Sequence, residues 1–191
     1  MIYPIVAFGD PILRKIARDI EPTYPDLKKL IADMFETMYA SAGVGLAAPQ
    51  IGLGIRLFVV DGSPLNDPED DPAEHDPTLE NFKKVFINAE IINEDGDDWA
   101  YEEGCLSIPG IRSDVYRPET LTIRYLDENW TEHTETYEAM AARIIQHEYD
   151  HLEGILFTDH LPLIKKQLIK KKLNNIAKGI VDVDYRMKFA K

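Results

Sequence analysis

The segment EAMAARIIQHEYDHLEG, residues 138–154, places two histidines four positions apart on a predicted helix that is otherwise largely apolar. Residues four apart lie on one face of an α-helix, about 6 Å apart along its axis. His147 and His151 can therefore direct their imidazoles at a single ion. Because the apolar neighbours predict that this helix is buried, the rest of the chain has to enclose it, and both imidazoles need polar partners there.

Glu148 directly follows the first of these histidines. It is rotated by about 100° from His147 around the helix, so its carboxylate can reach a water molecule beside the ion without taking a ligand position. The pattern His-Glu-x-x-His is typical of metal-dependent hydrolases. Two unrelated histidines bonded to backbone or water would give the same pattern, so the helix alone leaves both interpretations open.

A catalytic divalent metal commonly has three protein ligands and one open position, and the helix supplies only two. In metalloproteases with such a helix, the third ligand often lies downstream. His160 lies downstream, but the extended protease pattern would place this histidine at position 157, which is Phe157. Cys105, the only cysteine, is the other candidate, although a free cysteine is more often a small buried apolar side chain. The third ligand stays open at this point.

Composition and charge limit the classes of protein to which the chain can belong. Its 191 residues suit a single domain over 1–191. The formal net charge of -13 argues against a general affinity for nucleic acid. No apolar run approaches the roughly 20 residues that span a bilayer, and one cysteine allows no internal disulfide, which is typical of a reducing cytoplasm. We therefore expect a cytoplasmic monomer without a membrane segment.

Short alternating strands interspersed with three helices predict an α+β fold. Mostly antiparallel sheets would pack around the central histidine-bearing helix, with further helices towards the N-terminus and the C-terminus. The expected elements are a helix at 25–43, strands at 55–61, 82–92, 120–127 and 131–139, the central helix, and a C-terminal helix at 160–179. Residues 62–80 are acidic and contain several prolines, which predicts an exposed surface insertion.

Three segments resemble the signature motifs of the peptide deformylases: GVGLAAPQ at 43–50, EGCLS at 103–107 and QHEYDH at 146–151. They occur in the order of that family and at compatible separations, and GDPILR at 9–14 resembles a fourth, weaker feature. The resemblance implies a hydrolase that removes the formyl group from the N-terminal formylmethionine of newly made polypeptides and releases formate.

The resemblance also implies a metal ion and its ligands. The ligands would be Cys105, His147 and His151, with Glu148 as the carboxylate that transfers protons. Ferrous iron is the usual physiological metal of the family, and zinc, nickel or cobalt also fit these ligands. A thiolate ligand cancels one positive charge, so the ion is a weaker Lewis acid than one held by three neutral imidazoles.

Other residues would act on the substrate, again by resemblance. The side-chain amide of Gln50 and the backbone N–H of Leu106 would stabilise the oxyanion that forms during attack. Main-chain groups of Val44, Gly45 and Gly104 would hold the peptide in an extended, strand-like pose. These assignments explain why glycines flank the site without giving the glycines a chemical role.

Two further features have both a functional and a structural interpretation. Ile144, one turn before the first histidine, fits either the pocket for the methionine side chain or the core. Glu103 and Arg117 correspond to an ion pair beside the cysteine in the family, although two solvated charges are the alternative. Tyr101 is bulkier than the small or aliphatic residue expected at its position in the family, so the sequence does not determine the shape of the pocket mouth.

The C-terminal helix carries a basic cluster beside an apolar stripe. In one bacterial branch of the family such a helix docks at the ribosomal exit, where lysines could meet RNA phosphate. A solvated amphipathic face is the alternative. The lysines concerned are Lys165, Lys166, Lys170, Lys171 and Lys172.

Two other functions fit parts of the sequence. An endopeptidase could use the same helix, but its expected downstream ligand is missing. A metal-stabilised, ribosome-associated module without activity would have a closed coordination site, which leaves Glu148 and Gln50 without a role. Hydrolysis of N-formylmethionyl nascent peptides accounts for the most features.

Overall fold

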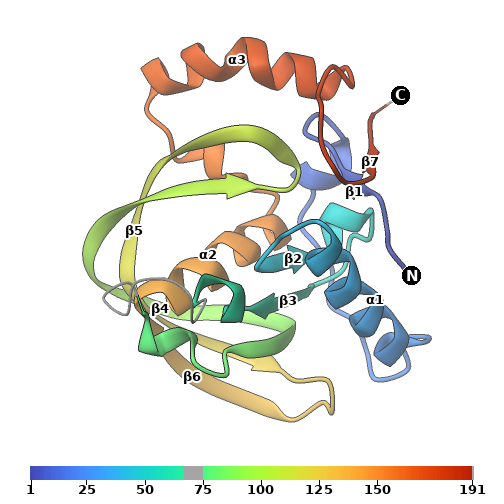
Figure 1. Cartoon of the computed structure of the whole chain (residues 1–191). Coiled ribbons are helices and arrows are strands. Elements are labelled where there is room, and N and C mark those ends of the chain that lie inside the picture. The colour runs from blue at the N-terminus through green and yellow to red at the C-terminus, as the bar shows by residue number, and fades with distance from the viewer. Residues whose placement is uncertain (67–74, 191) are drawn as a thin grey trace.

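The computed structural model describes residues 1–66 and 75–190 and has an α+β fold built around one central helix (Figure 1). Five antiparallel strands form the main sheet in the order β2-β3-β4-β5-β6. The strands are β2 (Gly45–Ala47), β3 (Leu57–Asp61), β4 (Lys83–Cys105), β5 (Ile108–Leu126) and β6 (Glu132–Glu138), and the helices are α1 (Leu27–Ala40), α2 (Ala139–Leu152) and α3 (Leu163–Ala177). The fold class predicted from the sequence is confirmed.

A second, small sheet brings an early and a late segment of the chain together. In it, β1 (Ile5–Val6) pairs in parallel with β7 (Met187–Lys188). The sequence analysis did not predict this pair, because two-residue strands have no periodicity that could reveal them.

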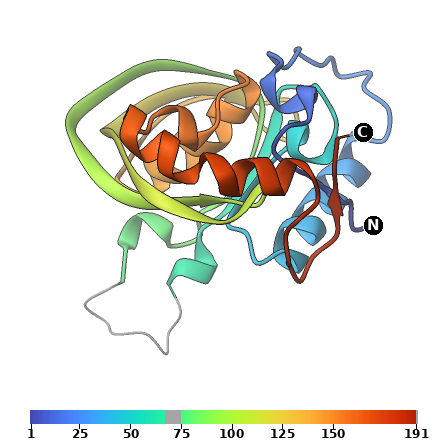
Figure 2. The same cartoon turned by 90° about the horizontal axis from the view of Figure 1, so that it is seen from above.

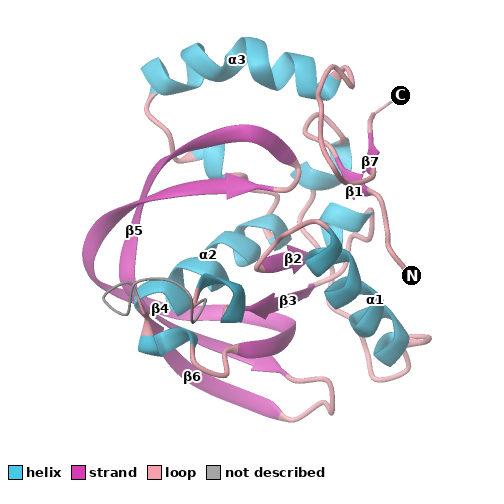
Figure 3. Ribbon diagram, viewed as in Figure 1, coloured by secondary structure: helices cyan, strands magenta, loops and turns pink. Residues whose placement is uncertain are grey.

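The strands β4 and β5 are much longer than the strands predicted at 82–92 and 120–127. They pair along most of their length and curve around α2, as the ribbon in Figure 3 shows. Shifts in their register, for instance between Asp95 and Asp98, mark bulges or irregularities in the ladder. Bulges bend a strand, and here they let the acidic run INEDGDDW stay within the sheet although its composition is typical of a loop.

The helix α2 is held in place by apolar packing against the concave face of the sheet. Ala142 and Ile145 are fully buried and belong to the same core cluster as Phe58 and Phe86, whose rings stack with centroids 4.6 Å apart. Burying an aliphatic or aromatic side chain contributes about 1.5–3 kcal/mol each. The histidines of α2 are therefore mounted on a rigid element in the interior of the domain.

The C-terminal helix α3 lies on the outside of the curved sheet (Figure 2). Its apolar residues differ in exposure, because Ile176 is buried while Leu163, Ile164 and Leu168 are 76–77% exposed. Among the described residues, no helix is long and apolar enough to cross a membrane.

The acidic segment predicted at 62–80 is described at its two ends only. The first limb forms an exposed 3₁₀ turn at Ser63–Leu65, whereas Leu79 on the second limb is buried in the core. The part of the prediction that concerns residues 67–74 lies outside the described residues.

Candidate metal centre

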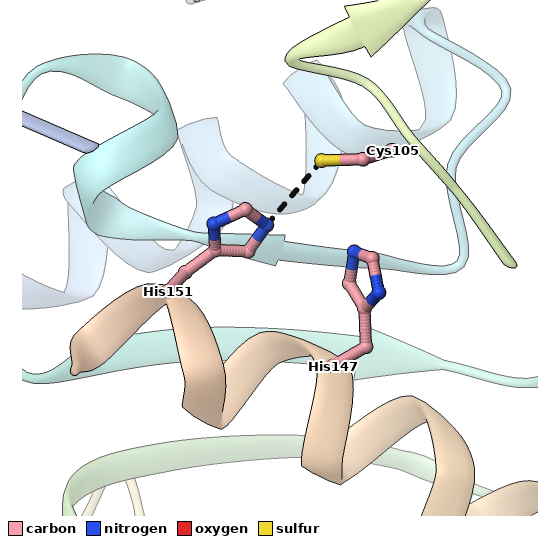
Figure 4. A group of neighbouring side chains, drawn as sticks. All are labelled: Cys105, His147 and His151. Atoms are coloured by element: carbon pink, nitrogen blue, oxygen red, sulfur yellow. Dashed lines mark hydrogen bonds between the residues drawn. The ribbon is translucent and has the colours of Figure 1, made fainter. Parts of the chain in front are cut away.

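The last residue of β4 and one face of α2 bring a thiol and two imidazoles together (Figure 4). The ligand atoms of Cys105, His147 and His151 all lie within 4.8 Å of one another. The Sγ of Cys105 is 3.4 Å from Nε2 of His151, and the two imidazole rings are nearly perpendicular, at 78°. His160, the alternative considered from the sequence, lies outside this group and contacts Asp150 at 2.8 Å.

The charges of these groups fit a divalent transition metal. Burial alone would raise the pKa of the Cys105 thiol, but the imidazoles of His151 and His147 outweigh burial and lower this pKa to about 5. The sulfur is therefore a thiolate at neutral pH, which is the form that binds metal. Donors around a tetrahedral ion, at bond lengths of 2.0–2.3 Å, lie about 3.6 Å apart, and the sulfur–nitrogen distance given above agrees with that spacing.

Glu103 orients one of the two imidazoles. Its carboxylate accepts a hydrogen bond from Nδ1 of His147 at 3.0 Å, which leaves Nε2 of that ring free to face the thiolate. Such a carboxylate–histidine pair is a common device for fixing a metal-binding imidazole. Burial lowers the pKa of His147, but the Cys105 thiolate and Glu103 outweigh it, so the pKa lies well above its ordinary value. The negative charges of Cys105 and Glu103 that favour a proton on His147 favour a metal cation at the same place.

Two arginines and an aspartate complete a buried network around Glu103. Arg117 donates to both carboxylate oxygens of Glu103, at 2.7 and 3.0 Å, and to Asp150 at 2.8 Å. Arg143 donates to Glu103 at 3.0 Å and stacks on the ring of Trp99, 4.4 Å from its centroid. Burial would raise the pKa of Glu103, but His147 and Arg117 hold it well below its usual range. This carboxylate therefore stays ionised although it is 4% exposed.

Glu148 lines the same cavity as Cys105 and His147. It is 4% exposed, and its Oε2 has no hydrogen-bond partner within the described part of the chain. Burial raises the pKa of Glu148 to about 7, against the opposing effect of His147 and His151. A β-carbon at position 45 would clash with this carboxylate, so Gly45 is needed for the close approach of β2 to α2.

The side-chain amide of Gln50 is hydrogen-bonded through its oxygen and, over longer distances, through its nitrogen. Its Oε1 accepts a hydrogen bond from the Ala47 N–H at 2.8 Å, and its Nε2 lies 3.5 Å from both Cys105 Sγ and Ser107 Oγ. Leu106 lies next to Cys105 in the turn after β4, and its carbonyl accepts a 2.7 Å hydrogen bond from Tyr185. Both candidate donors are thus held next to the thiolate.

A cavity of about 370 Å³ opens onto these groups. All four residues that the sequence analysis placed at the substrate line it. They are Val44, Gly45, Gly104 and Ile144. Tyr101, whose size left the shape of the pocket mouth undetermined from the sequence, also lines the cavity. Met140 and Leu65 line it as well, and neither was predicted.

Sequence reasoning missed several residues of the site. Arg143 lies one helical turn before His147, and a charge inside the apolar run AMAARIIQ was a readable sign that this arginine has a buried partner. Asp150 and Leu65 gave no comparable sign, because their neighbours in space come from other parts of the chain.

Comparison with known proteins relates the whole chain to one family. A family model described as polypeptide deformylase matches residues 2–167. The peptide deformylase of Flavobacterium johnsoniae is 56% identical over 190 residues, which cover 100% of this chain and 97% of the relative. The peptide deformylase of Cytophaga hutchinsonii is 58% identical over 189 residues, which cover 99% and 98% of the two chains.

Solved structures give the same result. The crystal structure of a peptide deformylase from Legionella pneumophila is similar with a TM-score of 0.78 and 38% identity, over 93% of this chain and 96% of that one. The peptide deformylase of Thermotoga maritima has a TM-score of 0.73 and 38% identity, over 85% of this chain and 99% of that one.

Proposed function

Since this chain belongs to the peptide deformylase family and is a metal-dependent hydrolase, we propose that Cys105, His147 and His151 hold its metal ion. The reaction removes the N-formyl group from the N-terminal formylmethionine of newly synthesised polypeptides and releases formate. The observation that carries the proposed assignment is the convergence of three donor atoms within 4.8 Å of one another beside a buried, unpaired carboxylate oxygen of Glu148.

The chemistry divides between the metal and the side chains around it. A bound divalent metal would lower the pKa of water and polarise the formyl carbonyl. Glu148 accepts the proton that this water loses as its oxygen bonds to the formyl carbon. The oxyanion that forms on the substrate accepts hydrogen bonds from Gln50 Nε2 and the Leu106 N–H. Glu148 then gives its proton to the amine nitrogen as the carbon–nitrogen bond breaks, and formate leaves.

The substrate backbone binds along β2. This strand is at the edge of the main sheet, so its outer side can pair with an extended peptide. The main-chain groups of Val44 and Gly45 on one side and of Gly104 on the other line the cavity and would hold the peptide between them. Ile144 lines the same cavity and supplies apolar contact for the methionine side chain.

Formate release from formyl-Met-Ala-Ser tests the reaction and the ligand assignment together. We expect turnover by the wild-type protein, and loss of activity with loss or change of the bound metal in Cys105→Ser, because a hydroxyl is a much poorer metal ligand than a thiolate. Elemental analysis of the purified variants measures the metal. Cleavage of unformylated internal peptide bonds would instead support an endopeptidase, and turnover with normal metal content in Cys105→Ser would contradict the assignment.

We expect the ferrous form to be the most active and to lose activity in air. Iron changes its coordination and oxidation state readily, whereas zinc favours a closed tetrahedral arrangement. The measurement is kcat for one protein preparation reconstituted anaerobically with Fe²⁺ or with Zn²⁺, Ni²⁺ or Co²⁺ under the same conditions. Equal rates for the iron and zinc forms would contradict this expectation.

The α3 helix is the proposed contact to the ribosome, where nascent chains emerge. It exposes Leu163, Ile164 and Leu168 beside its lysines, and Lys170, Lys171 and Lys172 are exposed. Cosedimentation with ribosomes should decrease as salt rises. It should be lost on deleting the residues after Leu161 and on reversing the charges of these three lysines together.

The charge reversal Lys28→Glu on α1 serves as the control for this ribosome experiment. Lys28 is also an exposed lysine, but it belongs to a helix remote from α3 in the sequence. Binding that survives the triple reversal, or that Lys28→Glu weakens equally, would contradict docking by α3.

Light scattering of the same proteins measures their mass in solution, and we expect monomers. The compartment we propose is the cytoplasm, where a thiolate site stays reduced.

A further inference from the structure

Apart from Ala42, which directly precedes the first signature motif, the wall of the substrate cavity includes one residue from outside the three signature motifs and from outside β4, β5 and α2. This residue is Leu65, at the end of the short turn that follows β3. It is a large apolar side chain that is 38% exposed. The remaining apolar wall includes Val44, Met140 and Ile144.

The turn that carries Leu65 is anchored at its start by a buried carboxylate. Oδ1 of Asp61, the last residue of β3, accepts hydrogen bonds from the backbone N–H of Ser63 at 3.0 Å and from the Ser63 hydroxyl at 2.6 Å. Tyr39 of α1 donates its hydroxyl to the other oxygen of Asp61. The Leu65 N–H closes the turn on the Gly62 carbonyl at 3.0 Å. These bonds therefore fix the direction in which the turn that carries Leu65 leaves the sheet.

The two limbs of the segment are also tied to each other directly after Leu65. The Asn66 side chain donates to the Asp76 carbonyl at 2.7 Å and accepts from the Asp76 N–H at 2.9 Å. Asp76 in turn caps the second limb by accepting from the Thr78 N–H and hydroxyl, at 2.8 and 2.7 Å. These bonds tie the two described limbs of the segment to each other.

The second limb reaches the first turn of α2. Thr78 Oγ1 accepts a hydrogen bond from the Ala141 N–H at 3.4 Å, where Glu138, the N-cap residue of α2, makes no side-chain cap of its own. Met140, the neighbour of Ala141, lines the cavity. The contacts from Asn66 through Asp76 to Thr78 thus link the turn that carries Leu65 to the first turn of α2, and both Leu65 and Met140 line the cavity.

We propose that Leu65 determines specificity by contacting the methionine side chain of the formylated substrate, in the cavity that Met140 also lines. This inference rests on the proposed function. Because the wall there is apolar, an unbranched thioether side chain that reaches Leu65 buries more apolar surface than a shorter side chain does. Through Leu65, the start of the acidic segment, which is anchored at Asp61, takes a direct part in substrate binding.

The test compares two formyl peptides that differ only in the first side chain, formyl-Met-Ala-Ser and formyl-norvalyl-Ala-Ser; the unbranched norvaline side chain lacks the sulfur and is one heavy atom shorter. In Leu65→Ala we expect kcat/KM for the methionyl peptide to fall about 5- to 20-fold and kcat/KM for the shorter norvalyl peptide to change less than twofold. In Leu65→Trp the cavity is shortened, so the preference should shift towards the norvalyl peptide. Leu163→Ala is the matched control, because Leu163 is 77% exposed on α3 and lies outside the cavity.

The outcomes separate this inference from the function on which it rests. A purely structural role of Leu65 would lower kcat/KM for both peptides by the same factor, and an unchanged ratio in Leu65→Ala overturns the inference. If the wild-type protein and Leu163→Ala release no formate from either peptide, the proposed function fails, and the inference fails with it.

Discussion

Replacing Glu148 by alanine should lower kcat for deformylation by a factor of about 10²–10⁴ while the metal content stays the same. The loss follows because the carboxylate is the group we assign to accept and return the proton. Among the described residues, the other two carboxylates that line the cavity are engaged elsewhere, since Glu103 is bonded to His147 and two arginines and the exposed Glu102 pairs with Arg112. Metal is retained because Glu148 is not among the three donors. Formate release and elemental analysis measure the two quantities.

Glu148→Gln is the matched variant for this prediction. It keeps the size and the hydrogen-bonding reach of the side chain but has no basic oxygen, so its activity should be as low as that of the alanine variant. If the glutamine variant kept more than a tenth of the wild-type kcat, Glu148 would be acting through hydrogen bonding or space filling, and the proton-transfer role would be wrong.

The same variant should change the stability of the metal-free protein in a pH-dependent way. Burial raises the pKa of Glu148 from 4.5 to about 7, so between these values the folded protein holds a proton that the unfolded chain has released. The free energy of unfolding therefore falls as pH rises through this window, by on the order of 3 kcal/mol. Glu148→Gln removes this effect, so Tm of the metal-free variant should exceed that of the wild type at pH 8 and approach it near pH 4.5.

The parts of the site that the sequence predicted are those encoded within one element. The 3.6-residue period places His147, Glu148 and His151 by local geometry alone, and the predicted helix at 138–154 corresponds to α2 at Ala139–Leu152. Cys105 lies more than forty residues upstream of these histidines, so its place beside them depends on how β4 packs against α2. Only the resemblance to a family, and not the residues alone, selected it from the candidates.

The parts that could not be predicted are those where tertiary packing overrides local composition. The run INEDGDDW has few apolar residues, yet it is part of β4 because the neighbouring strand β5 pairs with it. Likewise Leu65 lies within a segment that has the composition of a solvated loop, and the anchoring of that segment at Asp61 and Asp76 positions it at the cavity. Neither relation has a periodic signal in the sequence.

Arg117→Ala should destabilise the folded protein by about 3–5 kcal/mol and weaken metal retention about 10- to 100-fold. The guanidinium is 5% exposed and joins Glu103 to Asp150, so its removal leaves two buried carboxylates with fewer partners. Glu103 would keep its contact to Arg143 but would no longer be held from both sides, and its hold on the His147 imidazole would loosen. Thermal unfolding of the metal-free protein and competition with a chelator measure the two effects separately.

The matched control for this prediction is Arg124→Ala, because Arg124 lies on the same strand and pairs with Glu90 where both side chains are about half exposed. An exposed pair of this kind contributes about 0–1 kcal/mol, so this variant should unfold and retain metal much as the wild type does. Equal losses in the two variants would mean that any arginine of β5 matters to the same degree, which contradicts a specific role for the Glu103 network.

The pH dependence of the Arg117→Ala effect identifies its cause. Burial opposes ionisation of Glu103 and Asp150, but their partners, His147 and Arg117 for the first and His160 and Arg117 for the second, lower both pKa values. A carboxyl whose folded pKa is lowered stabilises the protein above its unfolded value and loses that contribution as pH falls. The difference in unfolding free energy between the wild type and Arg117→Ala should therefore be largest at neutral pH and shrink in acid. If lost packing were the cause instead, the difference would be the same at every pH.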